Sequence, residues 1–328
     1  MQVEGPTTDP QLTGRVFSDQ ISVVVCESSQ VQLRILSEAV REAGYEVHTA
    51  NSAEDALSLL NLMPVDIFLT GIEVGSTSGL EACWALKSNP ETETIYTIVI
   101  TASGQEKRLE ESLDAGADDF IRKPVNMTEL RARLRAASRL VRMQKQFRHM
   151  AETDALTGAA NRRAFMQYLD VQVDRARRQD TPVAAVMVDL DHFKRTNDTY
   201  GHAVGDRVLI ETVKQIQSCL RERDMLGRLG GEEFAVLLPG VTAASASEAA
   251  ERIRRAVAAV DVRVENGDRI PVTASLGVAV LEHDDMMATA EGLLQSADEA
   301  LYAAKAGGRD RVVRADMLGA DAPIQAVG

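Results

Sequence analysis

The chain has 328 residues, of which 45% are hydrophobic and 26% are charged, enough for two domains that each bury a core. Its formal net charge of −13 argues against broad binding to nucleic acid or to anionic membranes. It contains neither an apolar run as long as a membrane span nor a basic-then-apolar leader, so we expect a cytoplasmic protein. Cys26, Cys83 and Cys219 lack pairing or metal-ligand spacing and suit a reducing compartment.

The first half of the chain alternates short apolar runs with helical stretches. A tail over residues 1–18 is predicted to be disordered. The following alternation predicts an α/β domain over residues 19–126, built on a five-stranded, parallel, doubly wound sheet. Such sheets bind ligands at the carboxyl ends of their strands. The expected strands are 21–25, 46–49, 66–69, 97–101 and 119–121, and the expected helices are 30–43, 53–62, 80–87, 107–115 and one from Met127.

This first segment resembles a response-regulator receiver domain over roughly residues 19–125. The resemblance rests on the five repeats, on Thr101-Ala102 and on the run Gly116–Pro124. Receivers hold magnesium with two acids after the first strand and accept a phosphoryl group on an aspartate after the third. The resemblance therefore implies that Cys26 and Glu27 occupy the acid-pair positions and that Gly71 occupies the phosphoacceptor position.

Glycine cannot form an acyl phosphate, so the retained Thr101 and Lys123 would have no phosphoryl group to bind. We therefore expect a non-phosphorylated receiver that serves as a dimerisation module or as the docking site of a regulatory protein. In the alternative interpretation Asp66 or Glu73 accepts the phosphoryl group, although both are displaced from the expected position.

The last helix of the first domain continues without a breaker, which predicts a helical stalk over residues 127–153. Its apolar side chains at alternating three- and four-residue steps are Leu140, Met143, Phe147 and Met150. That spacing is an a/d coiled-coil seam of about two heptads. Basic residues cover the other faces, but interleaved aromatics are lacking and the chain is acidic, so a solvated stalk is favoured over a nucleic-acid site. A parallel two-helix stalk implies a homodimer.

The second half of the chain mixes helices with antiparallel strands, which predicts an α+β domain over residues 154–315 and a loose tail over 316–328. Its buried strand Pro182–Val188 runs into Asp189-Leu190-Asp191. A carboxylate that ends an apolar strand is costly unless a cation meets it. For Asp191 two interpretations remain open: it solvates the end of the strand, or it has a direct role in the site.

A hairpin follows, with two short strands joined at Gly230 and Gly231 and with Glu232 and Glu233 opening the second strand. Taken alone, it could equally be a solvated tip with two surface acids. Antiparallel pairing would bring Asp189 beside Glu232, with Glu233 as a further neighbour. The chain after Asp191 predicts a helix through His192–Asp198, whose first turn has free N–H groups that suit phosphates. Converging carboxylates beside this helix start suit magnesium, and two metals can activate a hydroxyl and neutralise a leaving phosphate.

Residues from about Asp154 to Val313 resemble a GGDEF domain, the diguanylate cyclase catalytic domain with a nucleotidyl-cyclase-like antiparallel sheet. Several motifs fall in family order and together carry the resemblance. They are Asp154…Leu156-Thr157-Gly158…Asn161-Arg162-Arg163, Asp189–Lys194, Asn197-Asp198, Gly201-His202, Gly205-Asp206, Gly230-Gly231-Glu232-Glu233-Phe234 and Ala304-Lys305…Gly308-Arg309.

The resemblance implies that two GTP molecules, one per protomer, condense to cyclic di-GMP and two pyrophosphates. Each 3′-hydroxyl would attack the α-phosphate of the other GTP. Asp189, Glu232 and the carbonyl of Leu190 would hold Mg²⁺ or Mn²⁺, and Glu233 would assist deprotonation of the hydroxyl. The implied substrate-binding residues are Asn197 and Asp206 for guanine, Gly230 and Gly231 for close backbone approach, Lys305 and Arg309 for the triphosphate, and Phe193 and Lys194.

The run Arg221-Glu222-Arg223-Asp224 has the form R-x-x-D and lies before the hairpin. A helix-end charge cluster would explain it without any function. In the GGDEF family this position is the product-inhibition site, so the resemblance implies that Arg221 and Asp224 bind an intercalated cyclic di-GMP dimer, helped by Arg252. Such binding would be coupled reciprocally to dimer geometry.

The sequence therefore favours a diguanylate cyclase gated by association through its receiver and stalk. The first alternative is a non-catalytic module that senses GTP or cyclic di-GMP, but the reactive residue types of every principal motif are present. The second is a transcriptional response regulator, but the receiver-like segment is not followed by a helix-turn-helix pattern. Phe234 and Tyr302 are expected in the core.

Overall fold

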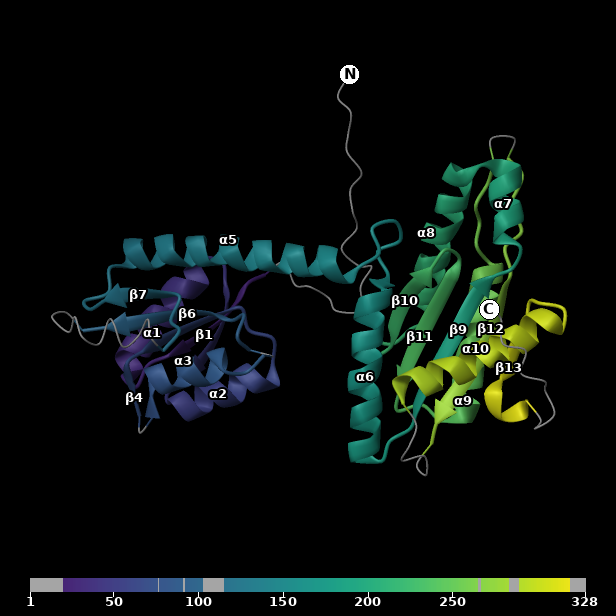
Figure 1. Cartoon of the computed structure of the whole chain (residues 1–328). Coiled ribbons are helices and arrows are strands. Elements are labelled where there is room, and N and C mark those ends of the chain that lie inside the picture. Colours follow the sequence, from purple (N-terminus) through teal and green to yellow (C-terminus); the bar gives the residue numbers. More distant parts are fainter. Residues whose placement is uncertain are drawn as a thin grey trace, which may run out of the picture. The chain divides into compact units, whose positions relative to one another are not determined.

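The computed structural model describes residues 20–75, 77–90, 92–102, 115–264, 267–282 and 289–318. These residues belong to two compact units, one over residues 18–148 and one beginning at His149 (Figure 1). The helix predicted over 107–115 and most of the two predicted tails lie outside the described residues. Within the described part of the chain, every helix is too short or too polar to cross a membrane.

The first unit is built on a five-stranded parallel sheet in the order β2-β1-β3-β6-β7. This confirms the predicted α/β fold. The strands are β1 (Ser22–Cys26), β2 (Glu46–Ala50), β3 (Ile67–Gly71), β6 (Tyr96–Thr101) and β7 (Asp119–Arg122), and a small ribbon is formed by β4 (Glu73–Val74) and β5 (Thr77–Ser78). The helices are α1 (Gln30–Glu42), α2 (Ala53–Leu62), α3 (Gly79–Lys87) and α5 (Met127–Glu152).

Alternate residues of the strands fill two cores, one on each face of this sheet. Val23 and Val25 pack with α1 and α5, whereas Val24 and Cys26 pack with α2 and α3. Strands buried on both faces read as continuous apolar runs, which is why the sequence revealed them. The three helices α1 to α3 each begin at a serine whose hydroxyl accepts a backbone N–H: Ser29, Ser52 and Ser78.

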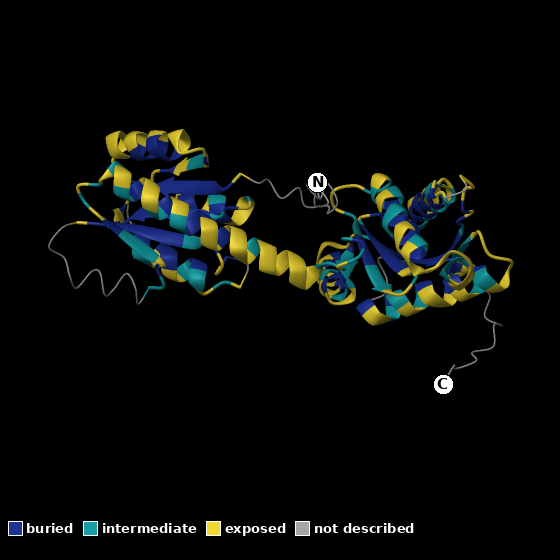
Figure 2. Ribbon diagram, turned by 90° about the horizontal axis from the view of Figure 1, so that it is seen from above, coloured by how far each residue is buried: buried dark blue, intermediate teal, exposed yellow. Residues whose placement is uncertain are grey.

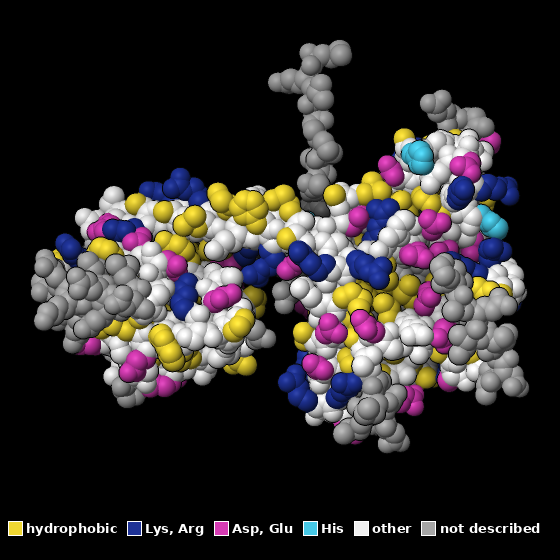
Figure 3. Space-filling model, in the orientation of Figure 1, with side chains coloured by type: hydrophobic (Ala, Val, Ile, Leu, Met, Phe, Trp, Pro, Cys, Tyr) yellow, Lys and Arg dark blue, Asp and Glu magenta, His cyan; other side chains and the backbone are white. Residues whose placement is uncertain are grey.

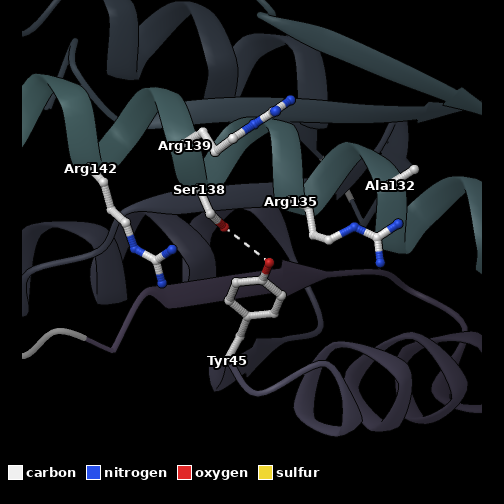
Figure 4. Close-up of a pocket in the computed structure, with 6 residues that line it drawn as sticks. All are labelled: Tyr45, Ala132, Arg135, Ser138, Arg139 and Arg142. Carbon is white, nitrogen blue, oxygen red and sulfur yellow. Dashed lines mark hydrogen bonds between the residues drawn. The ribbon is translucent and has the colours of Figure 1, made fainter.

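Helix α5 lies on the receiver sheet through its apolar residues Leu130, Leu134, Ala137 and Val141. The Ser138 hydroxyl donates to Tyr45 Oη at 3.0 Å. Both residues line a pocket of about 460 Å³, and in Figure 4 their bond lies between the side chains of Arg135 and Arg142. Further along, Lys145 pairs with Asp66 at 2.7 Å, so the helix remains attached to this unit well beyond residue 127.

The residues of the predicted a/d seam lie on another face of α5 and are exposed. Leu140, Met143, Phe147 and Met150 are 47%, 50%, 60% and 64% exposed, and apolar side chains are visible along α5 in Figure 3. Burial therefore alternates along the helix in Figure 2. The position of this seam agrees with the prediction; the dimer itself stays a prediction.

The second unit is built on a six-stranded sheet in the order β13-β12-β9-β11-β10-β8. Its centre is antiparallel, as predicted, with parallel pairs at both edges. The strands are β8 (Ala160–Asn161), β9 (Val183–Leu190), β10 (Met225–Gly230), β11 (Glu233–Pro239), β12 (Ala274–Leu281) and β13 (Val312–Arg314). The helices are α6 (Arg162–Gln179), α7 (Phe193–Tyr200), α8 (His202–Ser218), α9 (Ala243–Ala258), α10 (Ala290–Ala306) and the 3₁₀ turn η2 (Ala315–Met317).

The central strand β9 is buried along all eight residues. Helices α8 and α9 cover one face of the sheet, and α6 and α10 cover the other. Helix α10 lies very close to β12, because a Cβ at Gly277 would be 2.1 Å from the Ala297 carbonyl oxygen and 2.2 Å from Leu301 N. This close approach fixes the end of α10, which carries Lys305, beside the end of β9.

Candidate active site

The strand register brings the predicted acids together at the end of β9. Asp189 pairs directly with Glu233 of β11 on one side and with Ser275 of β12 on the other. Directly opposed residues of antiparallel strands project from the same face. Glu232 does not open the strand as the sequence indicated: it lies in the turn with Gly231, and its carbonyl accepts the Leu190 N–H at 3.3 Å.

Asp189 lies in an electrostatically unfavourable place for a carboxylate. Its side chain is 12% exposed and pairs with Lys305 at 2.8 Å. Burial raises the pKa of Asp189, Lys305 opposes that shift, and the charges of Glu232 and Glu233 reinforce it. One lysine thus faces three carboxylates, and further positive charge at this point would stabilise the ionised cluster.

The donors at this point fit a hard divalent cation. The described residues contain no group of three or more His, Cys, Asp or Glu side chains that could hold a metal. The predicted set of Asp189, Glu232 and the Leu190 carbonyl is smaller than such a group. It suits Mg²⁺, which binds through one or two carboxylates and completes its shell with water and substrate phosphates.

The hairpin turn has open space on its outer side and an arginine on its inner side. A Cβ at Gly230 or Gly231 would meet no atom within 4 Å, as expected where a ligand approaches the backbone. Arg228 donates from Nε and Nη2 to the Gly231 carbonyl at 3.0 and 2.8 Å. Its Nη1 pairs with Asp154 at 2.8 Å.

Arg228 is a site residue that the sequence reading missed. The signal was present: a charged side chain stands in an otherwise apolar strand, two residues before the glycine pair. Its partner Asp154 also accepts the Thr157 N–H and hydroxyl. Burial raises the pKa of Asp154, but the hydrogen bonds from Thr157 and Arg228 outweigh burial and lower it overall. Arg228 thereby links Asp154, in the segment that follows α5, to the hairpin turn at Gly231.

The predicted phosphate-binding helix start is α7. His192 precedes it with φ of 58°, and Phe193 is buried in the core, so Phe193 can offer a ligand only its backbone N–H. Lys194 is exposed. The helix start has the free N–H groups that favour anions.

The two residues predicted to read guanine lie on adjoining helices. Asn197 of α7 reaches over the start of α8, where a Cβ at Gly205 would be 1.8 Å from Asn197 Oδ1. Asp206 is the next residue and is exposed. The absence of a side chain at Gly205 is therefore what allows the amide of Asn197 to lie beside Asp206.

Asp191 proves to be fully hydrogen-bonded within the fold. Its carboxylate accepts the Thr273 hydroxyl at 2.8 Å, the Ser275 hydroxyl at 2.7 Å and the Asp310 N–H at 3.0 Å. These contacts favour a structural role over a direct one. The loop that Asp191 holds carries Arg309, which is exposed.

The three residues of the predicted product site converge. The Arg221 N–H donates to Asp224 Oδ2 at 2.8 Å, and Arg252 Nη2 donates to the Cys219 carbonyl at 3.0 Å. Burial raises the pKa of Asp224, and the charges of Arg221 and Arg252 act against that shift. A charged acid with two arginines in reach agrees with the predicted composition of this site; its ligand stays a prediction.

The residues at the predicted receiver-site positions lie together at the carboxyl ends of their strands. Glu27 is buried and pairs with Lys123 at 3.0 Å. A Cβ at Gly71 would lie 3.2 Å from Glu27 Oε2, so the carboxylate of Glu27 lies beside the place where an aspartate side chain would begin. Thr101 and Cys26 are buried, and burial raises the pKa of the Cys26 thiol to about 11.

One expectation about the core is wrong. Phe234 is fully buried, but Tyr302 is 71% exposed. Tyr302 lies between Leu301 and Ala304, which belong to the buried side of α10, and is itself not among the buried residues of the helix.

Both units of the chain are similar to known protein families. Residues 151–311 match the family model of the diguanylate cyclase GGDEF domain, and residues 23–135 match that of the response regulator receiver domain. The response regulator PleD of Caulobacter vibrioides is 36% identical over 258 residues, which cover 76% of this chain and 56% of PleD. The diguanylate cyclase DgcP of Pseudomonas aeruginosa is 39% identical over 165 residues, which cover 50% of this chain and 24% of DgcP.

Among solved structures, the chain is similar to the coiled coil and GGDEF domain of DgcB from Caulobacter crescentus, crystallised in complex with c-di-GMP. That similarity has a TM-score of 0.52 at 32% identity and covers 57% of this chain and 97% of the other.

The sheet order and the acid-bearing hairpin define a nucleotidyl-cyclase-like domain. The chain belongs to the GGDEF family and carries an N-terminal receiver domain, which confirms both resemblances seen in the sequence. It spans 56% of the length of PleD and 24% of that of DgcP.

Proposed function

We propose that this chain is a diguanylate cyclase that condenses two GTP molecules to cyclic di-GMP and two pyrophosphates. The observation that carries the proposal is the register of β9 and β11, which opposes Asp189 to Glu233 while Lys305 pairs with Asp189. Acids and a cation at the end of a buried strand, beside a helix start and an open glycine turn, are the groups that a triphosphate and its counter-ion require.

The chain's own residues would bind and orient the nucleotide. The amide of Asn197 and the carboxylate of Asp206 would hydrogen-bond guanine, which offers N1–H and N2 donors to an aspartate. The N–H groups at the start of α7 and the side chains of Lys305 and Arg309 would hold the phosphates. Glu233, on the same face as Asp189, would accept the proton of the attacking 3′-hydroxyl.

Asp189, Glu232 and the Leu190 carbonyl would hold Mg²⁺ or Mn²⁺. When bound, the metal would neutralise charge that develops on the reacting phosphate and lower the pKa of the hydroxyl. Such binding would also offset the negative charge around Asp189, whose pKa is raised by burial and by the charges of Glu232 and Glu233.

Each site would supply one half of the reaction, so two copies must meet. The exposed seam of Leu140, Met143, Phe147 and Met150 supports pairing of α5 with a second copy of itself. The receiver would contribute dimerisation or a docking site for a regulatory protein. Its phosphorylation is not part of the proposal, because Gly71 ends β3 and Asp66 is engaged by Lys145 and the Ser22 N–H before β3 begins.

Cyclic di-GMP would also act as an inhibitor at Arg221, Asp224 and Arg252. The support is their convergence in the α8–β10 turn and on α9. A planar guanidinium can form bidentate hydrogen bonds with guanine edges and with phosphates.

The test is incubation of the full chain with GTP and MgCl₂, followed by chromatography of the nucleotides. We expect cyclic di-GMP and two pyrophosphates per product, no product from ATP, and no product from Glu233→Gln. Unchanged GTP, or GTP merely hydrolysed to GDP, would contradict the proposal. A variant that only disrupts the seam, Phe147→Glu, should lose activity most strongly at low protein concentration.

A further inference from the structure

The loop after α10 holds an unusual backbone conformation. Gly308, Arg309 and Asp310 have φ of 113°, 62° and 44° in succession. Ending a helix needs one left-handed residue, normally glycine, and Gly307 N and Arg309 N already bond back to the Ala303 and Ala304 carbonyls. Two further non-glycine residues in this region are strained, and such strain persists only where the surroundings enforce it.

Two side chains from other elements hold Asp310 in this conformation, one through its backbone N–H and one through its carboxylate. Asp191 accepts the Asp310 N–H at 3.0 Å. Arg254 of α9 donates to the Asp310 carboxylate, while it also pairs with Glu251 at 2.8 Å. The Arg254 side chain is 19% exposed and that of Asp310 is 44% exposed, so the arginine is held within the fold while the carboxylate reaches it from the surface.

A third contact completes the clamp. The Arg311 side chain turns back and donates from Nε to the Arg309 carbonyl at 3.1 Å. Both peptide groups that flank Arg309 are thus fixed. The guanidinium of Arg309, in contrast, makes no hydrogen bond or ion pair with the part of the chain that the structure describes. The backbone of the loop is thus held by hydrogen bonds, whereas the guanidinium of Arg309 remains available to a ligand.

We propose that Asp191 and Arg254 are positioning residues, which hold the 308–310 loop in its left-handed form and so aim Arg309 at the triphosphate. Neither touches the nucleotide. The inference rests on the proposed function, because it needs a triphosphate beside Lys305. The proposal explains why a second aspartate, Asp191, follows Asp189 at the end of β9. Asp189 faces the ligand, whereas Asp191 binds the loop that carries Arg309.

The test is a double-mutant cycle on nucleotide binding. The probe is α,β-methylene-GTP with magnesium, measured by calorimetry, and GMP serves as the ligand without the distal phosphates. Arg254→Met should weaken binding of α,β-methylene-GTP roughly tenfold, as Arg309→Ala should, because both lose the same charge-assisted contact, that of Arg309 with the phosphates. GMP affinity should stay unchanged in both. The double variant should bind as Arg309→Ala alone, since Arg254 acts only through Arg309.

Two further variants separate positioning from general damage. Arg255→Met is the matched control, because Arg255 follows on the same helix, is 73% exposed and pairs with Glu251 but not with Asp310; it should bind both ligands normally. Asp191→Asn leaves one acceptor oxygen for three donors and should repeat the Arg254→Met pattern. Arg254→Lys, which keeps a cation beside Asp310, should restore most of the affinity.

Independent, multiplicative losses from Arg254→Met and Arg309→Ala would overturn the inference, as would equal weakening of GMP. Binding that follows the cycle in a chain that makes no cyclic di-GMP would support the clamp and refute the proposed function. If the chain makes cyclic di-GMP but the two substitutions weaken binding independently, the proposed function is supported and the positioning role of Asp191 and Arg254 is refuted. A wild-type chain that fails to bind the probe would overturn both.

Discussion

Replacing Arg228 by lysine should separate the stability of the catalytic domain from the placement of its hairpin turn. Arg228 donates twice to the Gly231 carbonyl and once to Asp154. A lysine can still pair with Asp154, but its single ammonium cannot reproduce the planar fork that reaches both acceptors. The turn, and with it Glu232, would lose its fixed position.

The structure gives the size of both effects. Side chains of Arg228 and Asp154 are 14% and 25% exposed, so removal of their charged hydrogen bond by Arg228→Ala should cost about 2 kcal/mol. For a domain of this size that is a fall in melting temperature of roughly 4–8 °C. Arg228→Lys should lose much less stability. Its activity should still fall by roughly 100-fold, the usual effect of a displacement near 1 Å at a reacting centre.

Pyrophosphate release from saturating GTP, measured with melting curves on the same samples, tests this separation. Asp154→Asn is the control, because it weakens the ion pair but leaves both contacts to Gly231 in place; we expect it to cost stability and to retain most of the activity. Wild-type turnover by Arg228→Lys would refute the reasoning, since the turn would then not depend on its arginine.

Three further outcomes follow from the same contacts. Because the pKa of Asp189 is raised, the folded chain binds the proton of this carboxyl more firmly than the unfolded chain, and the contribution of Asp189 to stability falls as pH rises above about 4. Asp189→Asn should therefore abolish synthesis but melt no lower than wild type at pH 8. A clearly lower melting temperature of the variant would contradict this reasoning. Arg221→Ala should relieve inhibition by added cyclic di-GMP while Arg223→Ala keeps it, and unchanged inhibition in Arg221→Ala would exclude the site. Intact mass after incubation with acetyl phosphate should show no phosphate on residues 18–148, and an added phosphate there would show that another residue replaces Gly71.

Several elements that the sequence predicted well are uniformly buried strands. Strands β1, β3 and β9 are buried at every residue, so each appears in the sequence as a continuous apolar run. The edge strands β8 and β13 have two and three residues, too few for any periodicity. They form because neighbouring strands offer free backbone groups, which local sequence does not encode.

The site was predictable in composition but not in register. The motifs identified Asp189 and the two glutamates, yet only the pairing of β9 with β11 puts Glu233 opposite Asp189 and leaves Glu232 in the turn. Arg228 and Asp154 are 74 residues apart, and no local pattern links them. The exposure of Tyr302 was available from helical spacing, because Leu293, Ala297, Ala300, Leu301 and Ala304 form the buried face of α10 and Tyr302 does not fall in that apolar stripe.

The acids at the end of β9 and the buried acid of the receiver differ in charge balance, and this difference favours different ligand requirements. In the receiver, one buried acid, Glu27, meets one cation, Lys123, and Cys26 supplies a thiol whose pKa is raised to about 11, so the cluster is neutral by itself and gains little from a metal. At the end of β9, Asp189 has one lysine against two neighbouring glutamates, and its pKa is raised. Local rules of charge burial are thus satisfied at the first cluster and broken at the second. A bound cation lowers the free energy most where charge remains unbalanced, which supports the proposed metal site at the hairpin and the proposed action of the receiver through its surface.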